Sequence, residues 1–214
     1  MRLPIFISFL IVSSAEHAVS QNAYIKMGQQ AYIEGNFKTA ITQLEKGRLI
    51  DSTNANALWM LGYSYFHSDN YLKSINAFTK EIAIEPADAH AYYYRAKAQF
   101  RLGTDSQIPA EKEKYLLGCI IDLTKAISIN PAEAKITSFY QNRGIAYKEY
   151  ALFRLQPNTK FYDKARCVNA LKAGMADLQK VYDSDRSRDD IAALIDAIKE
   201  KIAVASATST TARR

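Results

Sequence analysis

Apolar and small side chains recur along the chain at helical spacing, and polar residues that favour turns separate the segments. One set falls at i, i+3, i+4 and i+7, the spacing of a single helix face: Tyr24, Met27, Gly28 and Ala31. A later set repeats that spacing: Leu58, Leu61, Gly62 and Tyr65. A second helical segment follows each set, with turn formers at Gly35-Asn36 and Asp69-Asn70 between the two segments. The pattern predicts an all-α chain built from helical hairpins.

The hairpin pattern recurs at a fixed period of 34 residues, since Tyr24–Gly28 reappears as Leu58–Gly62 and again as Tyr92–Ala96. A fixed period in this range is typical of solenoid proteins, in which each repeat is one supersecondary unit. The sequence divides into a first repeat at 21–54, a second at 55–88, a third at 89–133 and a degenerate fourth at 134–185.

A further helix with an apolar stripe follows the fourth repeat. We predict that Ser187 begins this helix, with Asp189 and Asp190 in its first turn. A terminal helix with a polar outer face closes the exposed core of a solenoid. The sequence therefore predicts a capping helix over 186–205 and a flexible tail, rich in Ser, Thr and Ala, over 206–214.

The third and fourth repeats are longer than the first two. The third carries an insertion of about 11 residues, Thr104–Lys114, between its two helices, and the fourth carries a longer one. Both insertions fall at the same inter-helix turn and so at one edge of a solenoid. Two interpretations remain open, a recognition feature and tolerated surface loops.

The second repeat resembles those of the tetratricopeptide repeat family in these residues: Leu58, Leu61, Gly62, Tyr65, Ser74, Phe78 and Pro86. It departs from the family at Glu81, where a small residue is usual, and the first repeat departs at Ala31 and Ser52. The resemblance implies a right-handed superhelical solenoid of hairpins. It also implies that Gly62 and Ser74 lie where the two helices of the repeat approach most closely.

The resemblance further implies a concave face, lined by the first helix of each repeat, that binds a partner protein. We predict an aromatic floor with a basic flank there: Tyr32, Asn56, Trp59, Tyr63, Phe66, His90, Tyr93, Lys97 and Arg101. Such a surface suits a peptide segment with apolar anchors and acidic residues. Ile25 and Gln29 replace the Lys and Asn of the carboxylate clamp in the chaperone-binding subfamily, so a chaperone tail is not the expected ligand. In the alternative interpretation, Trp59 and Tyr63 only pack against the neighbouring repeat.

Composition and motifs favour a binding protein over an enzyme or a nucleic-acid-binding protein. The chain has 214 residues, 48% of them hydrophobic, and its net charge of +6 is spread without a basic run. Neither an aromatic RNA-binding motif nor zinc-ligand spacing is present, and no catalytic, cofactor or metal motif occurs. We predict a non-enzymatic protein-interaction scaffold without cofactor or metal. The alternative is a structural, self-associating component of the cell envelope.

The first residues resemble a secretory signal peptide, predicted at 1–20. A basic start at Met1-Arg2 precedes an apolar run from Leu3 to Val12, which is too short to cross a bilayer, and small residues follow. The sequence therefore predicts export to the periplasm or out of the cell. The alternative is a buried N-terminal helix or strand. The two cysteines, Cys119 and Cys167, either pair in that oxidising compartment or lie buried as free thiols.

The mature protein is predicted to begin at or near Gln21, because the helical repeat pattern starts there and the preceding apolar run has no place in the repeats. N-terminal sequencing of the exported protein measures this directly. A folded, mature protein that retains Met1 would contradict the predicted export.

Overall fold

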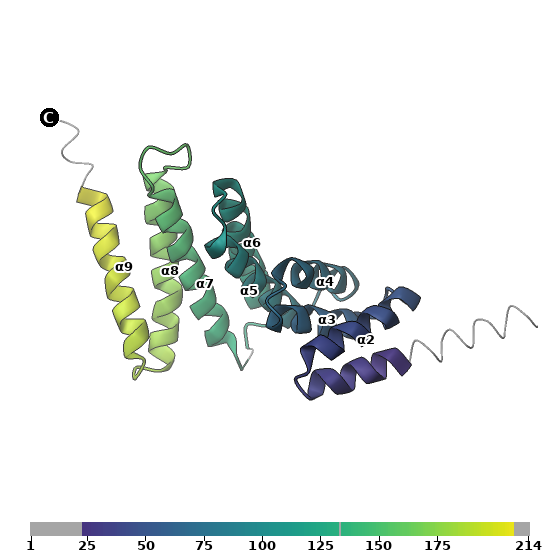
Figure 1. Ribbon diagram of the computed structural model, residues 1–214. Helices are drawn as coiled ribbons and strands as arrows, with labels where there is room; N and C mark the ends of the chain where they lie inside the picture. The colour runs from purple at the N-terminus through teal and green to yellow at the C-terminus, as the bar shows by residue number, and fades with distance from the viewer. Residues whose placement is uncertain (1–22, 133, 208–214) are drawn as a thin grey trace, which may run out of the picture. The chain divides into compact units, whose positions relative to one another are not determined.

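The computed structural model describes residues 23–132 and 134–207, and every regular element in those ranges is a helix. The chain forms two compact units, one ending at Ala87 and the other beginning at Asp88. The first unit contains a helix over 23–33 followed by α2 (Phe37–Ile50), α3 (Ala55–His67) and α4 (Tyr71–Ile84) (Figure 1). The second contains α5 (Ala89–Asp105), α6 (Pro109–Ile129), α7 (Ile136–Arg154), α8 (Lys164–Ser184) and α9 (Asp189–Ala207). The predicted all-α class is confirmed.

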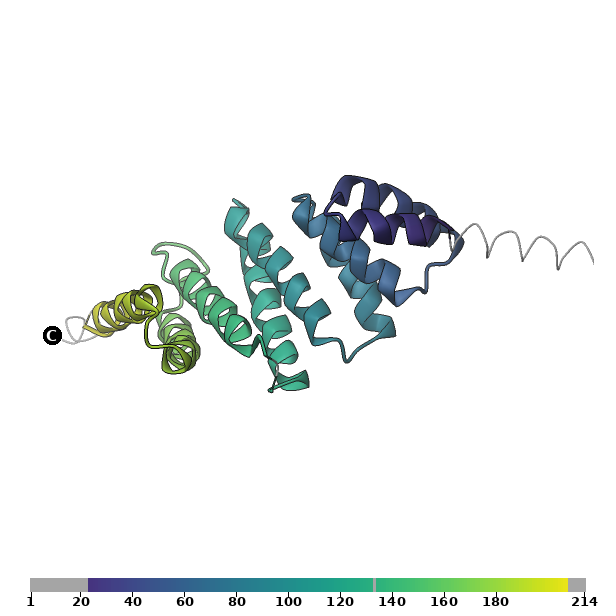
Figure 2. The same ribbon diagram turned by 90° about the horizontal axis from the view of Figure 1, so that it is seen from below.

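Within each unit, consecutive helices pair as hairpins. The helix over 23–33 pairs with α2 and α3 pairs with α4 in the first unit, while α5 pairs with α6 and α7 with α8 in the second (Figures 1 and 2). Helix α9 packs against α8 and ends the described part of the chain. The predicted signal segment at 1–20 lies outside the described residues, as do residues 208–214 of the predicted tail.

The two hairpin turns of the first unit share one backbone conformation. Gly35 and Asp69, which are 34 residues apart, both take positive φ, 73° and 56° respectively. The next residue caps the following helix: the Asn36 side chain accepts from the Thr39 amide at 3.2 Å, and Asn70 accepts from the Lys73 amide at 3.4 Å. A left-handed residue followed by an Asn cap thus reverses the chain within a connection of three residues.

A small residue faces a large one where the helices of each hairpin cross. A Cβ atom on Gly62 would lie 2.8 Å from three ring carbons of Phe78, and one on Gly28 would lie 2.6 Å from Leu44 Cγ. Gly144 has the same relation to Leu178 in the second unit, at 2.8 Å. The glycines therefore permit the close approach of the two helices. The Ser74 hydroxyl donates to the Gly62 carbonyl at 2.8 Å across the same crossing, as its predicted place in the hairpin requires.

Repeated ion pairs link the two helices of each hairpin in the second unit. Arg95 Nε and Nη2 each lie 2.7 Å from an oxygen of Asp122, and Arg143 holds Asp177 in the same way at 2.7 and 2.8 Å. Both carboxylates are only 4% exposed. By the repeat register, Leu61 and Ala77 occupy these two positions in the α3–α4 hairpin. The two hairpins of the second unit thus use a bidentate ion pair where the α3–α4 hairpin uses apolar side chains.

The predicted insertions mainly lengthen helices. Residues Thr104–Lys114 complete α5, form a connection of three residues and begin α6, so they do not form a separate loop. In the fourth repeat, α7 continues to Arg154 and a loop over 155–163 leads into α8. Arg154 is 8% exposed and donates to Glu113 of α6 at 2.6 Å and to Asp163 at 3.5 Å. This ion-pair network ties the two lengthened ends together.

The start of helix α9 differs from the sequence-based prediction. Helix α9 begins at Asp189, and the Ser187 hydroxyl donates to Asp185 at 2.6 Å, so the prediction that Ser187 begins the helix is wrong. A short turn that Asp185 stabilises precedes α9 instead.

Cys119 and Cys167 are free thiols buried in the core, which resolves the alternative of a disulfide. Burial raises the pKa of both thiols, so neither is an activated nucleophile.

Gly62→Leu is expected to lower the free energy of unfolding by at least about 2 kcal/mol, because the new side chain overlaps the Phe78 ring. Urea and thermal unfolding measure the loss. Ala83→Leu on the exposed face of α4 is the matched control, and it should leave stability nearly unchanged. Equal stability of the Gly62 variant and the wild type would show that the helices do not cross here.

Asp122→Ala is expected to cost about 3 to 5 kcal/mol of unfolding free energy, because it leaves the partly buried Arg95 guanidinium without its carboxylate. The double variant Arg95→Leu with Asp122→Ala installs the apolar residues of the α3–α4 hairpin and should recover most of that loss. A double-mutant cycle by urea unfolding checks both values. Additive losses in the double variant would contradict the pairing.

Candidate protein-binding surface

The residues predicted for the concave face fall into two sets, one in each unit. Tyr32, Asn56, Trp59, Tyr63 and Phe66 belong to the first unit. The second unit holds the remaining four: His90, Tyr93, Lys97 and Arg101. Each set therefore forms a surface of its own, and the two are described separately.

Aromatic rings from both hairpins of the first unit form one continuous cluster. The Trp59 and Tyr63 rings stack at 5.4 Å with an interplanar angle of 14°, as expected for residues one turn apart on α3. Tyr32, from the helix over 23–33, meets Trp59 edge-on at 6.2 Å and Tyr63 at 5.4 Å. We call Tyr32, Trp59 and Tyr63, with Phe37 and His67, the aromatic surface.

Phe37 and His67 extend the aromatic surface at the hairpin turns. Their rings stack at 4.9 Å, and His67 lies 4.3 Å from the Tyr63 ring. The repeat register already places His67 at a position that faces the concave surface, whereas Phe37 lies outside those positions. Phe37 belongs to the turn-plus-aromatic signal in the sequence and His67 continues the i, i+4 spacing of Trp59 and Tyr63, so both signals were present.

Helix α3 presents two different faces. Leu58, Leu61 and Tyr65 are at most 5% exposed and pack into the core, as their spacing indicates. Trp59 and Tyr63 lie on the other face and are half-buried, and Asn56 is exposed beside them. The aromatic surface thus packs on the core on one side and is open to solvent on the other.

Phe66 does not belong to the open surface. It is 9% exposed and contacts the rings of His67 and Tyr71, at 5.3 and 5.8 Å. The prediction that Phe66 lines the binding face is therefore wrong. Its position at i+7 from Trp59 is compatible with that face, but the turn into α4 brings Tyr71 over it, and only the tertiary structure fixes that contact.

Packing against the neighbouring repeat accounts for part of the burial of Trp59. Its ring contacts Tyr32 of the preceding hairpin, and it meets Phe78 of its own hairpin edge-on at 6.1 Å. Trp59 therefore packs against the neighbouring repeat and is also part of the half-buried aromatic surface. The contacts hold Trp59 and Tyr63 in fixed orientations, so they form a rigid surface.

A second aromatic site lies in the second unit, between α5 and α7. The Tyr93 ring stacks on Phe139 of α7 at 4.6 Å, and its hydroxyl accepts from Asn142 at 3.2 Å. The Lys97 ammonium lies over the Tyr93 and Tyr94 rings at 5.5 and 5.3 Å. Burial, and then the charge of Arg101, lower the pKa of Lys97.

His90 and Arg101 flank this site from either end of α5. His90 is half-buried against the edge of Phe139, at 5.9 Å, whereas Arg101 is exposed. The prediction omits Phe139 and Asn142, because it takes its residues from the first helices of the first three repeats only.

The described residues contain no group of three or more His, Cys, Asp or Glu side chains that could hold a metal ion. Within the same ranges, no helix combines the length and the apolar character needed to cross a bilayer.

Comparison with known proteins identifies the fold. The structure is similar to that of MamA from Desulfovibrio magneticus RS-1, with a TM-score of 0.63 and 15% identity over 90% of this chain and 92% of that one. A second MamA structure has a TM-score of 0.53 and 24% identity, covering 75% of this chain and 79% of that one. The first tetratricopeptide domain of Spaghetti (RPAP3), bound to an HSP90 peptide, has a TM-score of 0.50 and 21% identity over 72% of this chain and 96% of that one.

No protein-family model and no curated protein matches the sequence. The structural likeness nevertheless shows that this chain has the fold of tetratricopeptide proteins, which consists of consecutive helical hairpins, and here a terminal helix packs on the last of them.

Proposed function

We propose that this protein is a non-enzymatic interaction module whose aromatic surface binds a peptide segment of a partner protein. The observation that carries the proposal is the ring cluster of Tyr32, Trp59 and Tyr63, which is fixed by packing and open on one side. Partly exposed aromatic side chains of this kind are enriched in protein interfaces and commonly dominate their binding energy.

The fold supports a peptide ligand. The Spaghetti (RPAP3) domain is described as binding the HSP90 peptide SRMEEVD. This chain has Ile25 and Gln29 at the positions where the resemblance to the family places the clamp for such a tail. The aromatic surface therefore favours a partner segment with apolar anchors, whose affinity comes from burial against Trp59 and Tyr63.

The second unit is proposed to offer a separate, positively charged surface for partner recognition. Lys97 and Arg101 are one turn apart on α5, and Lys97 lies over two tyrosine rings. Cations in such a setting attract acidic residues and mainly raise the association rate. A partner segment that binds this surface accordingly carries Asp or Glu.

Export is a second part of the proposal, and it rests on the sequence of residues 1–20 alone. The basic start, the apolar run and the small residues that follow have the order of a secretory signal. The module would then act in the periplasm or outside the cell.

Trp59→Ala is expected to weaken partner binding by about 2 kcal/mol, roughly thirtyfold, because truncating a central aromatic anchor removes most of the energy of such an interface. Affinity capture from an envelope extract, followed by titration of the captured partner, measures the change. Circular dichroism should show nearly unchanged helicity.

Tyr162→Ala is the matched control, because this aromatic side chain is 48% exposed and lies in the loop after α7. It should bind the partner as the wild type does. If Trp59→Ala unfolds the protein and binding falls only in proportion, Trp59 is a core residue and the aromatic surface is not the binding site.

Lys97→Ala combined with Arg101→Ala is expected to weaken the binding of an acidic partner segment to the second unit chiefly at low salt, because charges at a protein surface are screened at high ionic strength. Titration at two salt concentrations distinguishes this electrostatic effect from the salt-independent loss expected for Trp59→Ala. An equal loss at both salt concentrations would contradict the proposed role of the two cations.

A further inference from the structure

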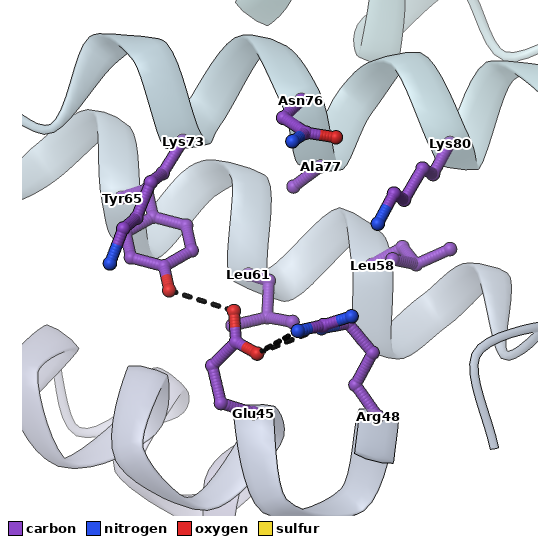
Figure 3. Close-up of a pocket in the computed structure, with 9 residues that line it drawn as sticks. All are labelled: Glu45, Arg48, Leu58, Leu61, Tyr65, Lys73, Asn76, Ala77 and Lys80. Carbon is purple, nitrogen blue, oxygen red and sulfur yellow. Dashed lines mark hydrogen bonds and ion pairs between the residues drawn. The ribbon is translucent and has the colours of Figure 1, made fainter.

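A polar pocket of about 330 Å³ lies between α2, α3 and α4 in the first unit (Figure 3). Its floor is formed by Leu58, Leu61 and Ala77, and its walls carry charged and polar side chains from the two flanking helices: Glu45, Arg48, Lys73, Asn76 and Lys80. Tyr65 completes the lining. We call this the α2–α4 pocket.

The α2–α4 pocket lies on the face of α3 that points away from the aromatic surface. Its α3 residues are Leu58, Leu61 and Tyr65, whereas the aromatic surface uses Trp59 and Tyr63. At 3.6 residues per turn, these two sets project in roughly opposite directions. A ligand in this pocket would therefore be separate from one on the aromatic surface.

Partners within the pocket already satisfy its one carboxylate. Glu45 accepts from the Tyr65 hydroxyl at 2.8 Å and from Arg48 Nε at 2.8 Å (Figure 3). Burial raises the pKa of Glu45, but the hydrogen bonds from Arg48 and Tyr65 outweigh it and leave that pKa lowered. Glu45 is consequently ionised at neutral pH and offsets the charge of Arg48.

Two lysines remain as excess positive charge. Lys73 and Lys80 lie at i and i+7 on α4 with Asn76 between them, so all three project over the pocket from one helix face (Figure 3). Neither lysine forms an ion pair with any residue in the described ranges. Lys73 does lie over the Tyr65 ring at 5.4 Å, but with Glu45 as its one carboxylate the pocket has a net positive charge above an apolar floor.

In two of the other three repeats, the lysine at the repeat position of Lys80 lies over a tyrosine ring. Lys46 and Lys180 stand at the repeat position of Lys80, and their ammonium groups lie over Tyr24 and Tyr140, at 5.5 and 4.3 Å. Leu58 replaces that tyrosine in the α3–α4 hairpin, so Lys80 has no ring beneath it at this position.

Two residues of the pocket floor occupy repeat positions that carry buried ion pairs in the hairpins of the second unit. Leu61 and Ala77 occupy the repeat positions of Arg95 and Asp122, and of Arg143 and Asp177. An aspartate carboxylate therefore lies at this place in two hairpins. In the α3–α4 hairpin the same position is Ala77, and cations surround it.

We propose that the α2–α4 pocket binds the carboxylate of an Asp or Glu side chain from an acidic peptide segment. In the hairpins of the second unit, Asp122 and Asp177 provide the acidic group at this position. In the α2–α4 pocket, the bound peptide would provide it instead. Lys73 and Lys80 neutralise it, the Asn76 amide donates to it, and its methylene stem packs on Leu58 and Leu61. The apolar floor favours such a side chain over inorganic phosphate, which would lose hydration there without apolar contact.

The test is a titration of isotope-labelled full-length protein with acetyl-Ala-Glu-Leu-Glu-Ala-amide at low salt, followed by the amide resonances of residues 73–80 and of the Asn76 side chain. Saturable shifts at these resonances are expected. The peptide with Gln in place of both Glu residues is the ligand control, and inorganic phosphate is titrated separately.

Lys73→Gln combined with Lys80→Gln should weaken the peptide by about tenfold or more, because both charge partners of the carboxylate are removed. Lys125→Gln combined with Lys172→Gln is the matched control, since it removes two exposed lysines from the second unit with the same change in net charge. Ala77→Asp places a carboxylate at the pocket floor and should also weaken the peptide, without loss of helicity.

The proposal is overturned if the Gln peptide produces the same shifts, if the control pair of lysines matters as much as the pocket pair, or if phosphate saturates these resonances and the peptide does not. Trp59→Ala should leave this titration unchanged. The proposal for the α2–α4 pocket and the proposal for the aromatic surface can therefore be contradicted independently of each other.

Discussion

Each hairpin of this protein depends on a close crossing of its two helices, where a small residue on the first helix faces a large one on the second. Gly62 accepts the ring of Phe78, and Gly28 and Gly144 accept leucines in the same way. Because the helices touch through backbone on one side, side chains beyond the crossing diverge at fixed angles. That constraint gives α3 a core face and a separate face for Trp59 and Tyr63.

The residues that directly precede those of each crossing differ between the hairpins, although their repeat positions are equivalent. Arg95 and Asp122 form a partly buried ion pair, whereas Leu61 and Ala77 leave room for a pocket. A buried pair adds orientation and specificity more than net stability. The second unit thus fills the position with its own charges, and the first unit leaves two lysines facing an open space.

Function in this fold follows from surfaces that the hairpins present. Tyr32 and Trp59 belong to different hairpins, and their contact joins the two into one aromatic surface. The proposed roles of this surface and of the α2–α4 pocket need no catalytic group. Both depend on rigid side chains held by packing, which lowers the entropy lost on binding.

The sequence by itself determined the hairpins, their 34-residue period and the core stripe of α3, because helical spacing and turn residues such as Gly35 and Asn70 are local signals. It also placed Trp59 and Tyr63 together, since i and i+4 share a helix face. The sequence could not show that Tyr71 covers Phe66, that Arg95 and Arg143 pair with aspartates 27 and 34 residues away, or that Thr104–Lys114 extends two helices. Tertiary structure decided these features, because each depends on which side chains meet when separate helices pack.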